Sequence, residues 1–214
     1  MKFFIIVKQT SQRLSGKNFL YLRNETLWER LINHLKGEEV YLNTDSKKIL
    51  EACEHKDWVT TISRNQKHIL MEETNISPVT SMTIDFLNEF ADNTDVIATP
   101  HCTSPYINKD TIYEAANKLN EGYDSVEAVT RHQHFAYYNG QAVNFDLDVV
   151  QKTQDLEPIY LSNGAFFIFK KETFLERNNR RGHNPYLYPI AFPESIEIDT
   201  LEDFKLAKKF ELEK

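Results

Sequence analysis

The residues best suited to chemistry are the cations of an N-terminal segment, Lys8–Asn24. Lys8, Arg13, Lys17 and Arg23 lie in this segment, which contains no Asp or Glu, whereas the whole chain has a formal net charge of −7. Because the overall field repels a polyphosphate, the chain could hold one only in a focused positive pocket. The segment is therefore a candidate phosphate site, and the alternative is an exposed basic loop.

This basic loop follows an apolar run at residues 3–7, whose length and composition predict a first buried strand. A strand that ends in a basic loop with a glycine, here Gly16, is a candidate for phosphate binding. The loop has neither the G-x-x-x-x-G-K-[ST] pattern of P-loops nor the G-x-G-x-x-G pattern of dinucleotide-binding folds. These two classes of phosphate site are therefore excluded.

Two carboxylates near the C-terminus form a second candidate site. Glu197 and Asp199 alternate with Ile196 and Ile198, which predicts a strand over 195–199 with both carboxylates on one face. Carboxylates on one face repel each other unless a cation joins them. The pair is a candidate metal site, and the alternative is an exposed strand edge whose charges favour solubility.

A helix is predicted directly after this pair. Thr200 and Asp203 have the spacing of a capping box, which would fix where the preceding strand ends. The face of this helix that we expect to be buried consists of Leu201, Phe204, Ala207 and Phe210. The cap would thereby hold Asp199 at a defined place.

Polar residues also follow other predicted strands. Asp45 comes after a strand at 39–43, where a helix N-cap is the better interpretation from the sequence alone. The loop at 99–105 follows another strand and is either a plain turn or a binding loop. His132 and His134 would share one face of a strand and could ligate zinc, although no third ligand is evident.

The elements that must position these groups alternate along the chain. We expect strands at 3–7, 39–43, 58–63, 95–99, 125–130 and 162–169, and helices at 25–36, 46–53, 81–90 and 111–119. This alternation predicts an α/β fold, a mostly parallel sheet with helices on both faces. Ligands of such sheets bind at the carboxyl ends of the strands, which is where the polar loops lie.

Length and composition indicate one large α/β domain over 1–214. There is no apolar stretch of about 18 residues and no leader with a cleavage site, so we expect a cytoplasmic protein without a membrane partner. We expect no nucleic-acid partner either. Cys53 and Cys102 match no metal spacing, so both are expected to be reduced.

The alternation of strands and helices stops at 131–157, where Asn139-Gly140 predicts a hairpin.

Five short motifs resemble those of the acylneuraminate cytidylyltransferases, the CMP-sialic acid synthetase-like family of sugar nucleotidyltransferases. The family's N-terminal signature is roughly R-x-x-S-x-R-L-P-G-K-N, and the residues that fit it are Ser11, Arg13, Leu14, Gly16, Lys17 and Asn18. The other four motifs are Thr103-Ser104-Pro105, Asp124-Ser125-Val126, Asn163-Gly164-Ala165 and Ile198-Asp199-Thr200. They occur in the family's order along nearly the whole chain.

The resemblance implies a three-layer, Rossmann-like nucleotidyltransferase fold and transfer of CMP from CTP to a 2-keto-3-deoxy sugar acid, with release of pyrophosphate. Arg13 and Lys17 would be catalytic, and the nucleotide would be bound by Lys8, Ser11, Arg13, Lys17, Asn18 and Asp45. The sugar would be bound by His101, Thr103, Ser104 and Asn163. Glu197 and Asp199 would hold Mg²⁺, and the excursion at 131–157 would form a homodimer.

The chain also departs from the family pattern. Lys8 replaces an arginine, Ser15 a proline and His101 a glutamine that contacts the sugar. The arginines that clamp the sugar carboxylate just upstream of Asn163 are missing, or the role has moved to another arginine. The candidates for that role are Arg131, Arg177, Arg180 and Arg181. Two alternatives therefore stay open: a different acceptor, such as Kdo, or a non-catalytic nucleotide-binding relative.

Overall fold

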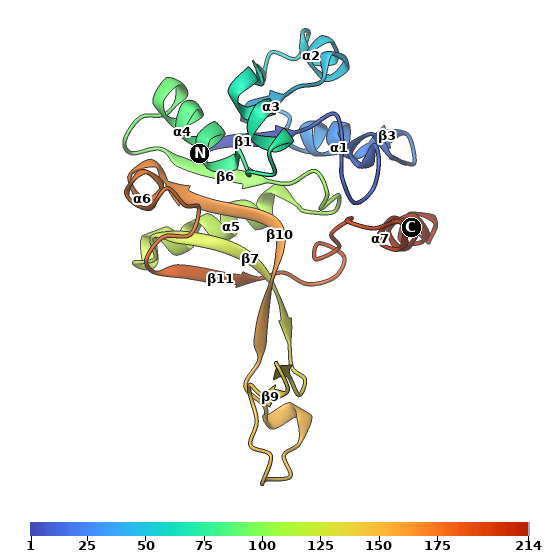
Figure 1. The fold of residues 1–214 in the computed structure, drawn as a ribbon, viewed down its shortest axis with the longest axis vertical. Coiled ribbons are helices and arrows are strands. Elements are labelled where there is room, and N and C mark those ends of the chain that lie inside the picture. The colour runs from blue at the N-terminus through green and yellow to red at the C-terminus, as the bar shows by residue number, and fades with distance from the viewer. Residues whose placement is uncertain (214) are drawn as a thin grey trace.

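A seven-stranded sheet in the order β11-β7-β10-β6-β1-β4-β5 forms the centre of the protein. The structure is a computed structural model that describes residues 1–213 (Figure 1). The strands are β1 (Lys2–Val7), β4 (Glu39–Thr44), β5 (Val59–Ser63), β6 (Val96–Pro100), β7 (Ser125–His132), β10 (Ile159–Lys170) and β11 (Pro185–Pro189). Only β10 runs antiparallel to its neighbours in this sheet, β6 and β7. The predicted mostly parallel sheet is confirmed.

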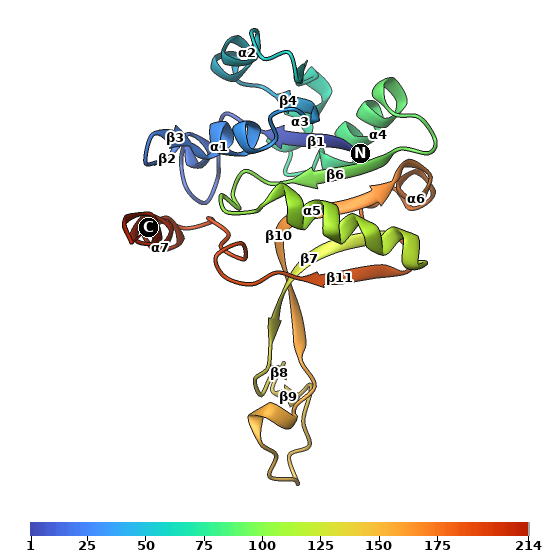
Figure 2. The same ribbon diagram turned by 180° about the vertical axis from the view of Figure 1, so that it is seen from behind.

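Helices cover both faces of this sheet. They are α1 (Leu27–His34), α2 (Lys47–Cys53), α3 (Gln66–Glu73), α4 (Val79–Phe90), α5 (Lys109–Ala116), α6 (Lys171–Arg177) and α7 (Leu201–Leu212). Helices α1, α2 and α5 pack on the face that carries Phe3 and Ile5, and Figure 2 shows α5 lying across the strands. Helices α4 and α6 cover the other face, where Phe86 stacks on Phe4 with 4.3 Å between ring centroids. The predicted three-layer arrangement is confirmed.

The structure differs from the predicted secondary structure at three elements: one helix and one strand were missed, and one predicted strand is absent. Helix α3 was not predicted because it buries only His68 and so shows no apolar face. Strand β11 was not predicted because prolines at both of its ends are unfavourable in a central strand, but it lies at the sheet edge. The strand predicted over 195–199 is wrong. That segment is irregular, and its Ile198 N donates to Thr103 O at 2.7 Å.

Helix α7 is tied to the N-terminal part of the chain. The capping box of Thr200 and Asp203 is confirmed. Phe204 and Ala207 are buried as predicted, whereas Leu201 is 48% exposed, so its predicted burial is wrong. The two short strands β2 (Tyr21–Leu22) and β3 (Glu25–Thr26) lie close by. Buried Glu211 of α7 forms ion pairs with Arg23 and Arg30, which hold the C-terminal helix beside the basic loop.

The excursion between β7 and β10 projects from the body as an arm (Figure 1). It contains β8 (Tyr137–Tyr138), β9 (Gln141–Ala142) and the 3-10 turn η3 (Thr153–Asp155). Asn139 and Gly140 both have positive φ, 49° and 78°, so the predicted hairpin turn is confirmed.

Among residues 1–213, no helix is long and apolar enough to cross a membrane.

Candidate active site

A cavity of about 550 Å³ lies where the predicted loops meet. It is lined by the loop after β1, the loop after β6, the connection from α3 to α4, the connection from α6 to β11, and the segment before α7. Its volume is in the range of small-molecule sites. Lys8, Ser11, Arg13, Lys17 and Asn18 all line it.

The loop after β1 is held in shape by polar contacts with other loops. Gly16 has φ +63°, a left-handed conformation that a side chain would strain. Asn18 Nδ2 donates to Lys8 O at 2.9 Å, and Cys102 Sγ donates to Asn18 Oδ1 at 3.4 Å. At the start of the loop, Gln9 N donates to Asp45 Oδ1 at 2.7 Å. Asp45 therefore braces this loop.

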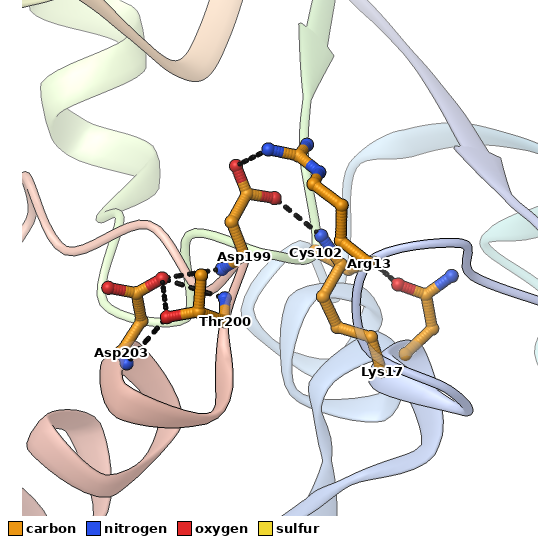
Figure 3. A network of polar contacts seen from close by, with 7 residues as sticks. Arg13, Lys17, Cys102, Asp199, Thr200 and Asp203 are labelled. Carbon is orange, nitrogen blue, oxygen red and sulfur yellow. Dashed lines mark hydrogen bonds and ion pairs between the residues drawn. The ribbon is translucent and has the colours of Figure 1, made fainter.

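Asp199 joins the basic loop to the C-terminal segment (Figure 3). Arg13 Nη1 donates to Asp199 Oδ2 at 2.5 Å, and Lys17 Nζ donates to Asp199 Oδ1 at 2.7 Å. The Lys17 side chain is 10% exposed and the Arg13 side chain 69%, so the Lys17 contact is the better shielded from water. Two candidate sites about 180 residues apart in the sequence thus meet in one cluster.

The backbone at Asp199 is fixed by the helix cap. Asp203 Oδ2 accepts hydrogen bonds from Asp199 N at 3.0 Å, Thr200 N at 2.8 Å and Thr200 Oγ1 at 2.8 Å, as Figure 3 shows. Burial raises the pKa of Asp203, but these hydrogen bonds outweigh it and leave the pKa below its ordinary value. Asp203 therefore serves as a charged clamp on the start of α7.

Glu197 has a different environment from Asp199. It lines the cavity, is half-buried and forms no ion pair within residues 1–213. Burial and the negative charge of Asp199 raise the pKa of Glu197 to about 6. A Cβ on Gly164 would lie 2.9 Å from Glu197 Oε1, and Gly164 has φ +67°. The glycine therefore lets β10 pass close to this carboxylate.

The loop after β6 contributes His101, Cys102 and Thr103 to the cavity. His101 N donates to Ala165 O at 2.9 Å. Burial and the nearby positive charges of Arg180 and Lys17 lower the pKa of the His101 imidazole to about 3. Burial likewise raises the pKa of the Cys102 thiol to about 12. Both side chains are neutral near neutral pH, and both cysteines are free thiols.

A family model described as "Cytidylyltransferase" matches residues 5–214. The chain belongs to the cytidylyltransferase family. Two curated relatives, the N-acylneuraminate cytidylyltransferases of Streptococcus agalactiae serotypes V and III, are each 24% identical over 213 residues. The alignment covers 94% of this chain and 50% of each relative, so the chain spans about half the length of these relatives.

Solved structures show that the fold of this cytidylyltransferase is shared. A 4-diphosphocytidyl-2C-methyl-D-erythritol synthase from Anaerococcus prevotii has a TM-score of 0.66 and 13% identity, covering 100% of this chain and 96% of that one. A CMP:2-keto-3-deoxy-manno-octonic acid synthetase complexed with CTP has a TM-score of 0.66 and 9% identity, covering 99% and 98%. At these identities the likeness concerns the fold alone.

Three of the residues expected in the site do not line the cavity of this cytidylyltransferase: Asp45, Ser104 and Asn163. Asp45 braces the basic loop, and Ser104 is 1% exposed. Asn163 Nδ2 donates to Thr130 Oγ1 at 3.1 Å, and its Oδ1 accepts from Ala165 N at 3.2 Å. In this structure Asn163 shapes the start of the buried part of β10.

The zinc hypothesis gains no support from the geometry. The rings of His132 and His134 lie 6.5 Å apart. Within residues 1–213, no group of three or more His, Cys, Asp or Glu side chains could hold a metal ion. The two carboxylates Glu197 and Asp199 are the remaining metal candidate, since Mg²⁺ takes only one or two protein carboxylates when phosphates and waters supply its other ligands.

One wall of the cavity could not be found from the sequence. The connection from α3 to α4 contributes Asn75, Ile76 and Ser77, and the connection from α6 to β11 contributes Arg180. Neither segment carries a motif, and α3 itself was not predicted. The sequence pointed to this region only through the four candidates for the missing carboxylate clamp, which were Arg131, Arg177, Arg180 and Arg181.

Proposed function

We propose that this cytidylyltransferase transfers CMP from CTP to a 2-keto-3-deoxy sugar acid of the nonulosonic type. The anomeric hydroxyl oxygen would attack the α-phosphorus and release its proton to solvent. The bond between that phosphorus and the oxygen bridging to the β-phosphate would break, and pyrophosphate would leave with the bonding electrons. The observation that carries the proposal is the cluster of Arg13, Lys17 and Asp199. At the cavity, this cluster joins the basic loop to the acidic segment, residues 195–199. The family match supports CTP as the donor.

The roles of the loop residues follow from charge and position. Lys17 and Arg13 would contact the triphosphate and stabilise negative charge that moves to the leaving pyrophosphate. Lys8 and Ser11 line the same cavity and would bind the remaining phosphate oxygens. Such a transfer needs positioning and charge neutralisation more than covalent catalysis, and the cavity offers both.

The residues present also fit a magnesium ion. Glu197 and Asp199 supply carboxylate oxygens, the ligand type that Mg²⁺ prefers, and the pKa of Glu197 is raised first by burial and then by the negative charge of Asp199. When bound, the ion would neutralise the triphosphate and polarise its oxygens. Asp199 now accepts from Arg13 and Lys17, so these cations would have to share or release its oxygens.

We further propose that the arm forms a homodimer. Its large apolar side chains are unusually exposed: Phe135 43%, Tyr137 60%, Tyr138 72%, Val143 57%, Leu147 69%, Val149 54% and Val150 103%. An apolar patch of this kind is typical of an interface. Light scattering at micromolar concentration should give a dimer, and Tyr138→Ser with Val150→Ser should shift it toward monomer. A monomeric parent protein would remove this proposal.

The function is tested by pyrophosphate release. The protein is incubated with MgCl₂, with CTP or UTP, and with N-acetylneuraminate or 2-keto-3-deoxy-manno-octonic acid. We expect release that requires CTP and one of these acids together. A parallel sample contains 2C-methyl-D-erythritol 4-phosphate, an acceptor that lacks a carboxylate. Binding of CTP without turnover of any acceptor would favour the non-catalytic alternative, and turnover only in the parallel sample would favour a different substrate class.

A further inference from the structure

Arg180 is a cavity-lining cation that the proposed mechanism does not yet use. It lies in the connection between α6 and β11, and its guanidinium carbon is 4.0 Å from the centroid of the Phe167 ring. Its Nη1 is 3.1 Å from His101 Nε2. The neutral imidazole accepts this hydrogen bond, so Phe167 and His101 fix the plane of the guanidinium from two sides.

Arg180 forms no ion pair within residues 1–213, although the charge of Glu127 acts on it from a longer distance. The adjacent Arg181 pairs with buried Glu127, since its Nε and Nη2 lie 2.6 and 2.5 Å from the two oxygens of this carboxylate. Burial, with the charge of Arg181, lowers the pKa of Arg180 to about 10, which still leaves it charged near neutral pH. A half-buried, unpaired guanidinium is costly unless a ligand supplies the anion.

Arg180 belongs to a different segment of the cavity lining from the cations assigned to the triphosphate. The cations Lys8, Arg13 and Lys17 come from the loop after β1, whereas Arg180 covers Phe167 of β10. A guanidinium presents a planar fork of donors that matches a carboxylate in a bidentate manner. Within the described residues 1–213, one of its donors is taken, by His101.

We propose that Arg180 binds the carboxylate of the acceptor, with Phe167 and His101 as positioning residues. This inference rests on the proposed function. It identifies Arg180 as the residue by which the enzyme selects acceptors that carry a carboxylate. It also gives the departure at position 101 a role: the histidine orients an arginine supplied by a different part of the chain.

The test compares the parent, Arg180→Lys and the matched control Arg177→Lys. Arg177, another of the four candidate arginines, lies at the end of α6, is exposed and does not line the cavity; its Nη1 donates to Gly182 O at 2.6 Å, a single hydrogen bond that a lysine can also donate. Pyrophosphate release gives KM for the acid, and calorimetry gives Kd for CTP. We expect Arg180→Lys to raise KM for the acid by about tenfold or more, since lysine keeps the charge but loses the fork. The Kd of Arg180→Lys for CTP should stay within about twofold of the parental value. For Arg177→Lys, both the KM for the acid and the Kd for CTP should also stay within about twofold.

Other outcomes separate this inference from the proposed function. An unchanged KM for the acid in Arg180→Lys would overturn the inference and leave the function standing, and a weakened Kd for CTP would assign Arg180 to the triphosphate. If the parent turns over neither acid, the same two acids are titrated against the Arg180 Nε resonance, identified by its loss in Arg180→Lys. A specific shift would support carboxylate binding without the proposed reaction, and no shift would overturn the inference.

Discussion

The two walls of the cavity hold their positive charges in different ways. On the loop side, Arg13 and Lys17 both form ion pairs with Asp199, whose single negative charge offsets one of their two positive charges. In the connection from α6 to β11, Arg181 pairs with Glu127, whereas Arg180 forms no ion pair within residues 1–213. The loop side is therefore assembled around an internal anion, whereas the Arg180 side is complete only with a ligand.

Asp199→Asn should have the largest effect, because Asp199 both joins the loop to the acidic segment and is a proposed Mg²⁺ ligand. We expect kcat for pyrophosphate release to fall by about 100-fold or more. Shielded Lys17 also loses its partner, so the free energy of unfolding should fall by about 1–3 kcal/mol. Glu202→Gln, an exposed neighbour, is the control. A folded Asp199→Asn protein with the parental rate would contradict the metal assignment.

Lys17→Met and Arg13→Met compare a shielded with an exposed cation of the same cluster. Titration of CTP should show a Kd raised about 10- to 100-fold for Lys17→Met. The change for Arg13→Met should be smaller, because its side chain is 69% exposed and its charge is screened by water. If both variants bind CTP like the parent, the loop is not the triphosphate site.

Glu197→Gln tests how much the buried negative charge of Glu197, next to Asp199, destabilises the folded protein. The pKa of Glu197 is raised from 4.5 to about 6, so between these values the folded state binds more protons than the unfolded state. The parent must therefore lose stability as the pH rises through this window. The neutral variant should be more stable by about 1–2 kcal/mol near pH 7, and the gain should vanish below about pH 4.5. Denaturant titrations at several pH values measure it, and a gain independent of pH would refute the assignment.

His101→Gln should have the smallest effect. Glutamine can also accept a hydrogen bond from Arg180, so KM for the acid should change by less than about fivefold. Because the pKa of His101 is about 3, this histidine should add no titration to kcat/KM between about pH 5 and 8. A parental pH profile with a step near 6 that disappears in His101→Gln would show that the imidazole carries charge.

The features predicted best from the sequence are those whose residues lie close together along the chain. The basic loop, the capped α7 and the strands with apolar runs such as β1 and β6 are local patterns, and all of these elements are present. The alternation at 195–199 predicts a strand, but the segment is irregular, because alternation also arises when Ile196 and Ile198 pack against β2, α1 and α7. The wall with Arg180 was ambiguous because four arginines were equivalent in sequence. Only tertiary packing distinguishes Arg181, paired with Glu127, from Arg180 beside His101.

Phosphorus NMR of one reaction tests the central claim most directly, because it identifies both the donor and the kind of acceptor. The parent protein is mixed with MgCl₂, CTP and the two sugar acids, and in a parallel sample with 2C-methyl-D-erythritol 4-phosphate. We predict that the triphosphate signals decay in the first sample while one phosphodiester and pyrophosphate appear in equal amounts. Consumption of CTP only in the second sample, with a new diphosphate diester, would contradict the claim that this cavity joins CMP to a carboxylate-bearing sugar.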